Sequence, residues 1–316
     1  EISANVRFAL TGTPVENRLS ELWSIFDFLM PGFLYSYRKF RERYELPIVK
    51  NQDPEALTAL RRMTGPFVLR RLKKDVLREL PGKEERIVYS AASGRQQKLY
   101  TASALKLKEA LAGGAWSGNG KLEVLSQLMR LRQICCDPAL CFEDYTGESA
   151  KLETCVSLIA SASAAGHKIL LFSQFASMLE RIRERILQEG ISSHLLVGAT
   201  PKEERSRMVQ AFASDEVPVF LISLKAGGTG LNLTAADIVI HYDPWWNVAA
   251  QNQATDRAYR IGQEKPVTVY KLILKDTIEE NLLKLQNAKL ALAAQVVSEG
   301  MVSLGDLRQN ELMELF

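Results

Sequence analysis

Features that would place this chain in a specialised class of protein are absent. No hydrophobic run approaches the roughly 18 apolar residues of a membrane-spanning helix, although 47% of the 316 residues are apolar. The formal net charge is only +3 and there is no long basic tail, so overall charge says little about nucleic acid binding. The sequence therefore predicts a globular protein with no membrane span.

Histidine and cysteine are scarce, which argues against a metal centre. The chain has 3 His and 4 Cys, and the adjacent pair Cys135–Cys136 does not have the spacing of common zinc ligands. We therefore predict no metal-ligating residue within this chain. Reduced thiols are the default state of cysteines in the cytosol, so we expect a cytoplasmic protein.

A phosphate-binding loop of the form G-x-x-x-x-G-K-[ST] is also missing. The nearest Gly-Lys pair, in Gly118-Asn-Gly-Lys121, lacks the spacing and the Ser or Thr of that motif. The chain begins without an initiator Met or a signal peptide, which leads us to expect an excised part of a longer protein.

From about residue 151 the sequence alternates between short apolar runs and helical patterns. Runs typical of buried strands occur at residues 168–172, 194–197, 217–222, 238–242 and 267–270. Helices are expected between strands and again from about residue 277. This alternation predicts an α/β fold, with a parallel sheet that has helices on both faces.

The first half of the chain has a different pattern. Residues 7–10 are typical of a short strand, and apolar residues at helical spacing predict a helix from about Leu22 to Leu29, ended by Pro31-Gly32. Residues 33–150 show helical patterns and no clear run of strands. The sequence thus predicts an all-helical region before the α/β region.

The segment from Gln253 to Gln263 contains the most informative pattern. At 100° per residue, Gln253, Asp256, Arg257 and Arg260 share one face of a helix. Two arginines one turn apart present a fixed set of donors that suits phosphate oxygens, although a surface ion-pair face has the same pattern. The preceding strand and loop favour phosphate, because ligands of open α/β sheets gather at the carboxyl ends of strands.

These residues resemble a known family. The run Asp243-Pro-Trp-Trp-Asn247 followed by Gln-Ala-x-Asp-Arg-x-x-Arg-Ile-Gly-Gln is similar to motif VI of the Swi/Snf-type ATPases, helicase-related DNA translocases of superfamily two. Segments similar to other family motifs occur in the family's order, namely Leu10–Asn17 (motif III), Ile169–Phe175 (motif IV) and Leu221–Leu233 (motif V). Residues 67–76 and 128–138 also resemble family blocks. The compact spacing favours the bacterial branch.

The resemblance implies a RecA-like fold in which ATP sits between two lobes. Residues 1–32 would be the end of the first lobe, 33–150 a helical protrusion and linker region, 151–290 the second lobe and 291–316 a helical tail. In the family, the phosphate-binding loop and the Asp-Glu motif that holds Mg²⁺ lie upstream, in the first lobe. The missing N-terminal lobe is therefore an expected partner of this chain.

The resemblance also assigns residues to the ATP side of the motor. Arg257 and Arg260 match the two motif VI arginines that act as catalytic fingers in the family, and a structural salt bridge is the alternative. Gln253 would position the nucleotide or hold an arginine in place. Gly230 and Asn232 of motif V would face the nucleotide.

A second group of residues is assigned to DNA and to coupling. Contacts with the DNA backbone are implied for Ser173, Gln174, Lys225, Gly227, Gly228 and Trp246. For Ser173, a role as a helix cap explains the pattern nearly as well as contact with DNA. For Trp246, packing in the core explains it equally well. Thr11, Gly12 and Thr13 of motif III would couple the nucleotide site to the lobe interface.

The resemblance implies that the chain is the C-terminal half of an ATP-dependent double-stranded DNA translocase. It would be inactive alone, would use ATP and Mg²⁺ with its missing lobe, and would be nucleoid-associated in a bacterium. Two alternatives are a noncatalytic nucleic-acid-binding module and a protein-interaction scaffold built from residues 33–150. The intact arginine pair argues against the first, because grip on DNA alone does not need it.

Overall fold

The computed structural model describes residues 4–10, 19–51, 53–69, 77, 79–92, 94–113, 120–224, 226, 230–284 and 286. Contacts divide them into two compact units, one within Glu1–Arg78 and the other within Glu79–Gln286. Some predicted residues lie outside the described ranges, namely Thr11, Gly12, Thr13, Lys225, Gly227, Gly228 and the tail 291–316. What the sequence predicts for them stays a prediction.

The first unit contains short helices, which are α1 (Leu19–Leu29), α2 (Tyr37–Phe40), α3 (Leu46–Asn51) and α4 (Pro54–Thr64). Its small core consists of Phe26, Leu34, Phe40, Tyr44 and Leu60. The predicted helix is confirmed as α1, but the predicted strand at residues 7–10 is wrong. A strand needs a hydrogen-bonded neighbour, and the described residues of this unit contain no other strand.

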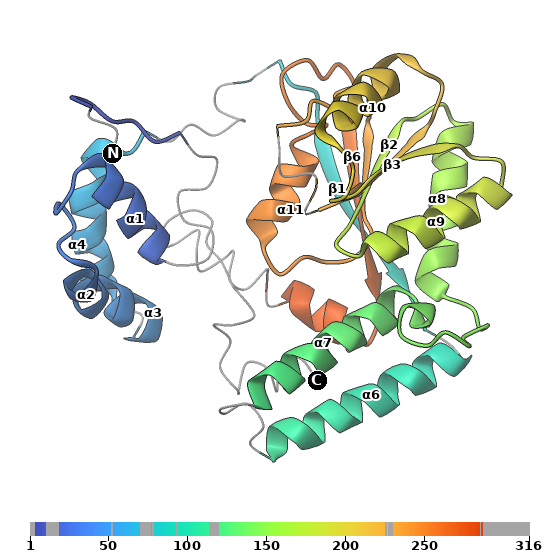
Figure 1. The fold of residues 1–316 in the computed structure, drawn as a ribbon, viewed down its shortest axis with the longest axis horizontal. Coiled ribbons are helices and arrows are strands. Elements are labelled where there is room, and N and C mark those ends of the chain that lie inside the picture. The colour runs from blue at the N-terminus through green and yellow to red at the C-terminus, as the bar shows by residue number, and fades with distance from the viewer. Residues whose placement is uncertain are drawn as a thin grey trace. The chain divides into compact units, whose positions relative to one another are not determined.

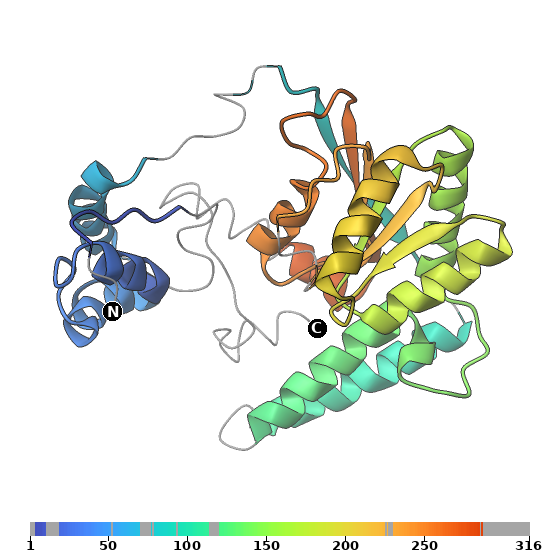
Figure 2. The same ribbon diagram turned by 45° about the horizontal axis from the view of Figure 1, so that its top comes forward.

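The second unit is built on a six-stranded sheet in which all neighbouring strands are parallel (Figures 1 and 2). The strand order is β1-β6-β5-β2-β4-β3. The strands are β1 (Lys83–Ser90), β2 (Ile169–Ser173), β3 (Ser193–Leu196), β4 (Val219–Ser223), β5 (Ile238–His241) and β6 (Val267–Leu274). The predicted α/β fold is confirmed, and each of the five predicted strands is present within four residues of its predicted limits.

Strand β1 is the element that sequence reasoning missed. Residues 33–150 were predicted to be helical, yet Lys83–Ser90 pairs with β6 along its whole length. The run Lys-Glu-Glu-Arg-Ile-Val-Tyr-Ser has little apolar character because β1 lies at an edge of the sheet, where most of its side chains stay exposed. Only the partner β6, whose paired residues are 184 positions further along the sequence, makes it a strand.

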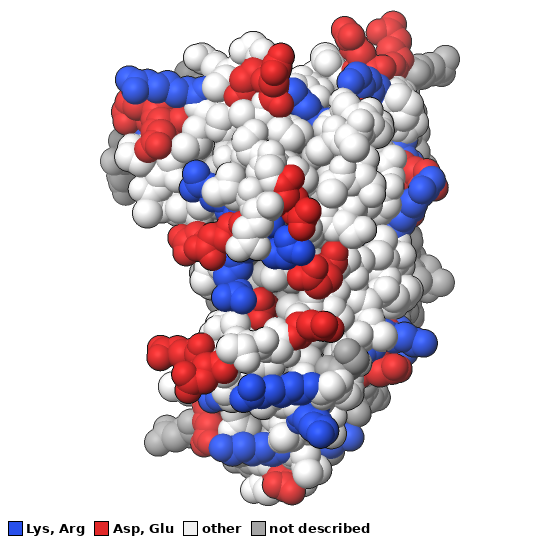
Figure 3. Space-filling view, turned by 90° about the vertical axis from the view of Figure 1, so that its right-hand side faces the viewer, with Lys and Arg blue, Asp and Glu red and all other residues white. Residues whose placement is uncertain are grey.

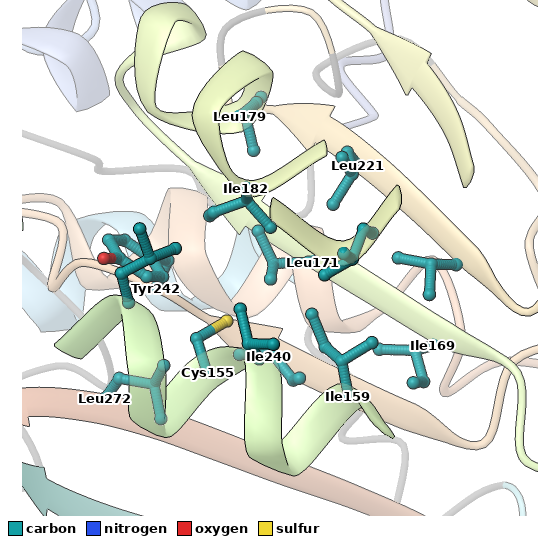
Figure 4. Close-up of a cluster of buried hydrophobic side chains, with 14 of the residues drawn as sticks. Cys155, Ile159, Ile169, Leu171, Leu179, Ile182, Leu221, Ile240, Tyr242 and Leu272 are labelled. Atoms are coloured by element: carbon teal, nitrogen blue, oxygen red, sulfur yellow. The ribbon is translucent and has the colours of Figure 1, made fainter. Parts of the chain in front are cut away.

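Helices cover both faces of the sheet (Figures 1 and 2). On one face, α8 (Ala150–Ala164) and α9 (Ala176–Gln188) pack against the central strands. On the other face lie α10 (Lys202–Ser214) and α11 (Val248–Thr255). Figure 4 shows the first of these two cores, where Ile159 of α8 and Ile182 of α9 lie close to Leu171 of β2. Strands β2 and β4 are buried along their whole length, as strands covered on both faces should be.

A helical hairpin, α6 (Gly94–Ala112) and α7 (Gly120–Cys136), belongs to the same unit as the sheet. The buried Gln96 side chain joins its base, because its Nε2 donates to Ile134 O at 3.0 Å and its Oε1 accepts from Ala150 N at 3.3 Å. Tyr100 Oη accepts a bond from Ile278 N at 2.7 Å. The sequence predicts that the second lobe begins at residue 151, a boundary placed by the order of the motifs. The contacts of the described residues instead divide the chain between Arg78 and Glu79.

A buried ion pair ties α8 to the segment after β6. Lys151 Nζ lies 2.6 Å from both carboxylate oxygens of Glu279, and neither side chain is more than 1% exposed. Burial alone would lower the pKa of Lys151, but the Glu279 carboxylate reverses this and raises it.

Within the described ranges, none of the helices has both the length and the apolar character that a membrane crossing demands.

Candidate functional site

The ends of β2 and β5 meet in a network of buried polar groups. Ser173 Oγ donates to Asp243 Oδ1 at 2.5 Å, and the same carboxylate oxygen accepts from Gln174 N at 3.3 Å. Ser173 is fully buried, and its Oγ also accepts from Phe175 N at 3.1 Å. Contact between this hydroxyl and a DNA phosphate would require the bond to Asp243 to open. The alternative of a helix cap at Ser173 is not what the structure has, because Phe175 is the N-cap of α9.

Arg132 of α7 reaches this network from the hairpin. Its Nη1 donates to Gln174 Oε1 at 2.9 Å and its Nη2 donates to Pro244 O at 2.7 Å. The carboxylate of Asp243 lies 3.7 Å from Nη2, and the guanidinium is only 3% exposed. Burial lowers the pKa of Arg132, and the Asp243 charge opposes this shift. The sequence analysis noted the segment 128–138 as a family block but did not single out Arg132. The feature that could have identified it is a charged residue placed among the apolar residues of a helix.

Trp246 packs inside the protein beside Arg132. Its ring centroid lies 5.5 Å from the Arg132 guanidinium carbon, and the residue is 8% exposed. The indole Nε1 is buried and has no hydrogen-bond partner among the described residues. The sequence left two roles open for Trp246, contact with DNA or packing in the core. The structure shows the packing, and the contact with DNA stays a prediction.

Helix α11 begins directly after this network. Asn247 is its N-cap, because its Oδ1 accepts a bond from Ala250 N at 3.1 Å. Gln251 on the first turns accepts a bond from Trp245 N through its side chain, at 3.2 Å. The network and the helix start are therefore one connected structure.

The arginine pair lies at the opposite end of α11. The helix ends at Thr255, so Asp256, Arg257 and Arg260 lie on the turns that follow. The prediction that they share one helix face with Gln253 is therefore wrong. A helix of only 8 residues cannot carry the whole segment. The backbone turns at Asp256 because Arg257 O accepts from Leu233 N at 3.0 Å, a bond to another segment.

The turns that carry Arg257 and Arg260, residues 256–260, are called the arginine turn below. Gln263 holds the arginine turn against the segment that enters β5. Its Nε2 donates to three backbone oxygens, those of Thr234, Ala236 and Ala258, at 3.1, 2.8 and 3.1 Å. The arginine turn therefore lies beside the start of β5, while the predicted ligand loop, residues 243–247, follows the end of β5. The sequence singled out Gln263 only as part of motif VI. A polar residue with 6% exposure whose amide saturates several carbonyls is a structural clamp.

Both guanidinium groups remain open to a ligand. Arg257 and Arg260 are each partly exposed. Among the described residues, the one side-chain hydrogen bond that joins them to the rest of the protein is long, from Arg260 Nη1 to Leu231 O at 3.4 Å. Arg257 Nε is buried and has no hydrogen-bond partner among the described residues. Burial lowers the pKa of Arg257 and the charge of Arg260 lowers it further, while Asp256 partly compensates. Two like charges held close together favour an anion between or beside them.

The remaining predicted residues on this side are Gly230, Asn232 and Gln253. Gly230 has a φ of +39° and is exposed, so the backbone there is in a region that favours glycine. Asn232 is exposed and directly follows Leu231, whose O accepts the bond from Arg260. Gln253 is half-buried on α11. Asn232 thus lies in the same surface region as the arginine turn.

Charge on another face of the protein is mixed. Figure 3 shows Lys and Arg side chains interspersed with Asp and Glu. This pattern is that of an ordinary protein surface, whereas a nucleic-acid groove usually carries a stripe of one sign.

Among the described residues, no group of three or more His, Cys, Asp or Glu side chains is placed to hold a metal ion.

Family models match most of the chain. Residues 1–140 match the SNF2-related domain, and residues 150–262 match the helicase conserved C-terminal domain. YwqA of Bacillus subtilis, named as an ATP-dependent helicase/translocase, is 43% identical over 98% of this chain and 34% of its own length. Human TATA-binding protein-associated factor 172 is 34% identical over 100% of this chain and 20% of its own length. The chain thus spans about a third or less of these curated relatives.

Solved structures agree with the family models. The Sulfolobus solfataricus SWI2/SNF2 ATPase core in complex with dsDNA has 36% identity and a TM-score of 0.63, over 97% of this chain and 66% of that chain. The C-terminal domain of a Sulfolobus solfataricus SWI2/SNF2 ATPase has 32% identity and a TM-score of 0.60, over 74% of this chain and 97% of that chain.

Proposed function

Because the chain belongs to the SWI2/SNF2 family of ATPases, we propose that it forms the C-terminal half of an ATP-dependent double-stranded DNA translocase. The observation that carries this proposal is the arginine turn. Its two guanidinium groups lie on a braced backbone, and few of their donors have a partner among the described residues. Such fixed, planar donors suit the oxygens of a phosphate chain.

In this proposal Arg257 and Arg260 are the catalytic fingers. Phosphoryl transfer is accelerated by positive charge on the transferred group, and one finger arginine typically contributes about 10³–10⁵ in rate. Gly230, Asn232 and Gln253 would line the nucleotide side. The phosphate-binding loop and the Mg²⁺ ligands would come from an N-terminal lobe, since no such loop occurs in this sequence.

DNA would be held largely through its phosphates. The ends of β2 and β5, with Gln174 and Trp246, would form part of the contact, together with Lys225, Gly227 and Gly228 of motif V. Support comes from a related ATPase core whose structure is a complex with dsDNA. Contacts of this kind read little sequence, and affinity should fall with salt by about one log–log unit per phosphate contact.

The test is ATP hydrolysis with and without double-stranded DNA. It compares this chain alone, the full-length protein that contains it, and the full-length protein with Arg260→Ala. Arg207→Ala is the matched control, because Arg207 is an exposed arginine of α10 on the same face of the sheet. We expect no turnover by the chain alone, DNA-stimulated turnover by the full-length protein and its control, and a loss of about 10³-fold or more in Arg260→Ala. Turnover by the chain alone would overturn the proposal.

A further inference from the structure

Arg132 is a buried charge with an unusual set of partners. Its guanidinium contacts two separate loops, since Gln174 follows β2 and Pro244 follows β5. A third element, the hairpin helix α7, supplies Arg132 itself. Burying a guanidinium is costly, and well-packed apolar residues often stabilise a fold equally well. Stability alone therefore does not explain why an arginine occupies this place.

The first consequence concerns Gln174. An arginine has only donors, so the Gln174 side chain must turn its oxygen toward Arg132 and its Nε2 away from it. That Nε2 has no hydrogen-bond partner among the described residues. An unsatisfied buried donor destabilises the protein, and a phosphate oxygen would satisfy it after a small opening of the loop. Arg132 thus holds the amide in the orientation that presents a donor.

The second consequence concerns α11. Arg132 Nη2 binds Pro244 O, and its guanidinium lies against the Trp246 ring. Pro244 lies three residues and Trp246 one residue before Asn247, the N-cap of α11, and the arginine turn follows the other end of the helix. Helix α11 is short and packs its buried Ala249, Gln251 and Ala254 against the body of the unit. A shift at its start is therefore transmitted to Arg257 and Arg260 as a movement of one rigid piece.

We propose that Arg132 is a positioning residue that couples the DNA-contacting amide of Gln174 to α11 and hence to the arginine turn. The proposal rests on the proposed translocase function. Arg132 itself touches neither DNA nor nucleotide. Its role is to keep the donor at Gln174 and the start of α11 in one fixed relation, so that occupation of the first affects the second.

The test uses the full-length protein with Arg132→Lys. A lysine keeps the charge, but as a single point donor it cannot bind Gln174 Oε1 and Pro244 O together in the fixed geometry of a guanidinium. We expect the DNA concentration that gives half-maximal ATPase activity to rise about tenfold, which is the size of one lost charge-assisted hydrogen bond. The ratio of the DNA-stimulated rate to the DNA-free rate should fall as well, because Gln174 and the start of α11 are no longer held in one fixed relation. Arg130→Lys, two residues away and exposed, is the control and should change neither value.

A double-mutant cycle with Gln174→Ala separates positioning from general damage. If Arg132 acts by orienting Gln174, then Arg132→Lys should change half-saturation by DNA by less than about twofold in the Gln174→Ala background. Multiplied effects of the two substitutions would overturn the proposal, as would an equal fall in the DNA-free and DNA-stimulated rates. A failure of the proposed function would look different, because the unaltered protein would then show no stimulation by DNA.

A second variant covers the case in which Arg132→Lys does not fold. Arg132→Gln combined with Asp243→Asn removes both buried charges, so neither is left unpaired. This variant should show the same rise of about tenfold in half-saturation by DNA. Unchanged half-saturation in a folded double variant would overturn the proposal.

Discussion

The arginines near the two ends of α11 differ in their burial and in the use of their hydrogen-bond donors. At its start, Arg132 is 3% exposed and its donors bind Gln174 and Pro244 inside the protein. At its end, Arg257 and Arg260 are partly exposed, and most of their donors have no partner in the described part of the chain. The difference teaches that an arginine's role here is decided by where its donors are used. Donors used internally organise the structure, and donors left over are available to a ligand.

The largest expected effect separates activity from stability at the open end. Arg257→Ala in the full-length protein should lower ATP turnover by about 10³–10⁵-fold, because a finger arginine acts mainly in the transition state. The free energy of unfolding of this chain should change by no more than about 0.5 kcal/mol, as at ordinary surface positions. Turnover assays and denaturant unfolding measure the two quantities. A large loss of stability together with modest loss of turnover would identify Arg257 as a structural residue.

At the buried end the balance should be reversed. Arg132→Ala should lower the free energy of unfolding of this chain by about 3–5 kcal/mol, since it leaves the buried Asp243 carboxylate without its neighbouring cation. Arg130→Ala, at an exposed position on the same helix, should cost no more than about 0.5 kcal/mol. Urea unfolding of the two variants beside the unaltered chain gives the comparison. Equal stability of the two variants would contradict the contrast between the ends.

The clamp under the open end should have an intermediate effect. Gln263→Leu keeps the side chain about the same size but leaves the three carbonyl oxygens of Thr234, Ala236 and Ala258 without this donor. We expect a loss of about 1–3 kcal/mol in the free energy of unfolding and a smaller loss of turnover than in Arg257→Ala. If turnover falls as far as it does in the finger variants while stability is unchanged, then Gln263 acts on the ligand directly.

The smallest effect is a pH dependence from the strand that links the two ends. His241 of β5 is buried, and burial above all, with the nearby charge of Lys271, lowers its pKa to about 3. The unfolded chain binds a proton near pH 6.5 and the folded chain does not, so this contribution is complete above pH 6.5 and is lost as pH falls toward 3. It should remove about 1.4 kcal/mol between pH 7.5 and 5.5.

His241→Gln is the control for this pH dependence. The variant has no group that titrates in that range at this position, so the difference in unfolding free energy between pH 7.5 and 5.5 should be smaller in it by about 1.4 kcal/mol. Urea unfolding at the two pH values measures this difference. Identical pH dependence of the variant and the unaltered chain would show that the folded protein accepts a proton at His241.

Sequence reasoning was accurate where a local pattern is determined by burial on both faces. The apolar runs of β2, β4 and β5 predicted central strands because such strands need apolar side chains on both sides. It failed at β1, whose exposed edge position requires no such run. The prediction of a helix through Arg260 also failed, because α11 ends at Thr255 although the helical pattern continues in the sequence. After the helix end, Arg257 O accepts a hydrogen bond from Leu233 N, which lies on another segment.

The sequence by itself determined the parallel sheet, the family and the two arginines of the motif VI segment, because these depend on periodicity and on residues close together in the chain. Only the tertiary structure decided which polar groups meet. Arg132 and Pro244 are 112 residues apart, and Ser173 and Asp243 are 70 residues apart. No local pattern encodes such a meeting, since it arises when parallel strands bring their ends to one edge of the sheet and a helix from elsewhere packs beside them. The same packing decided which arginine is buried and which stays open.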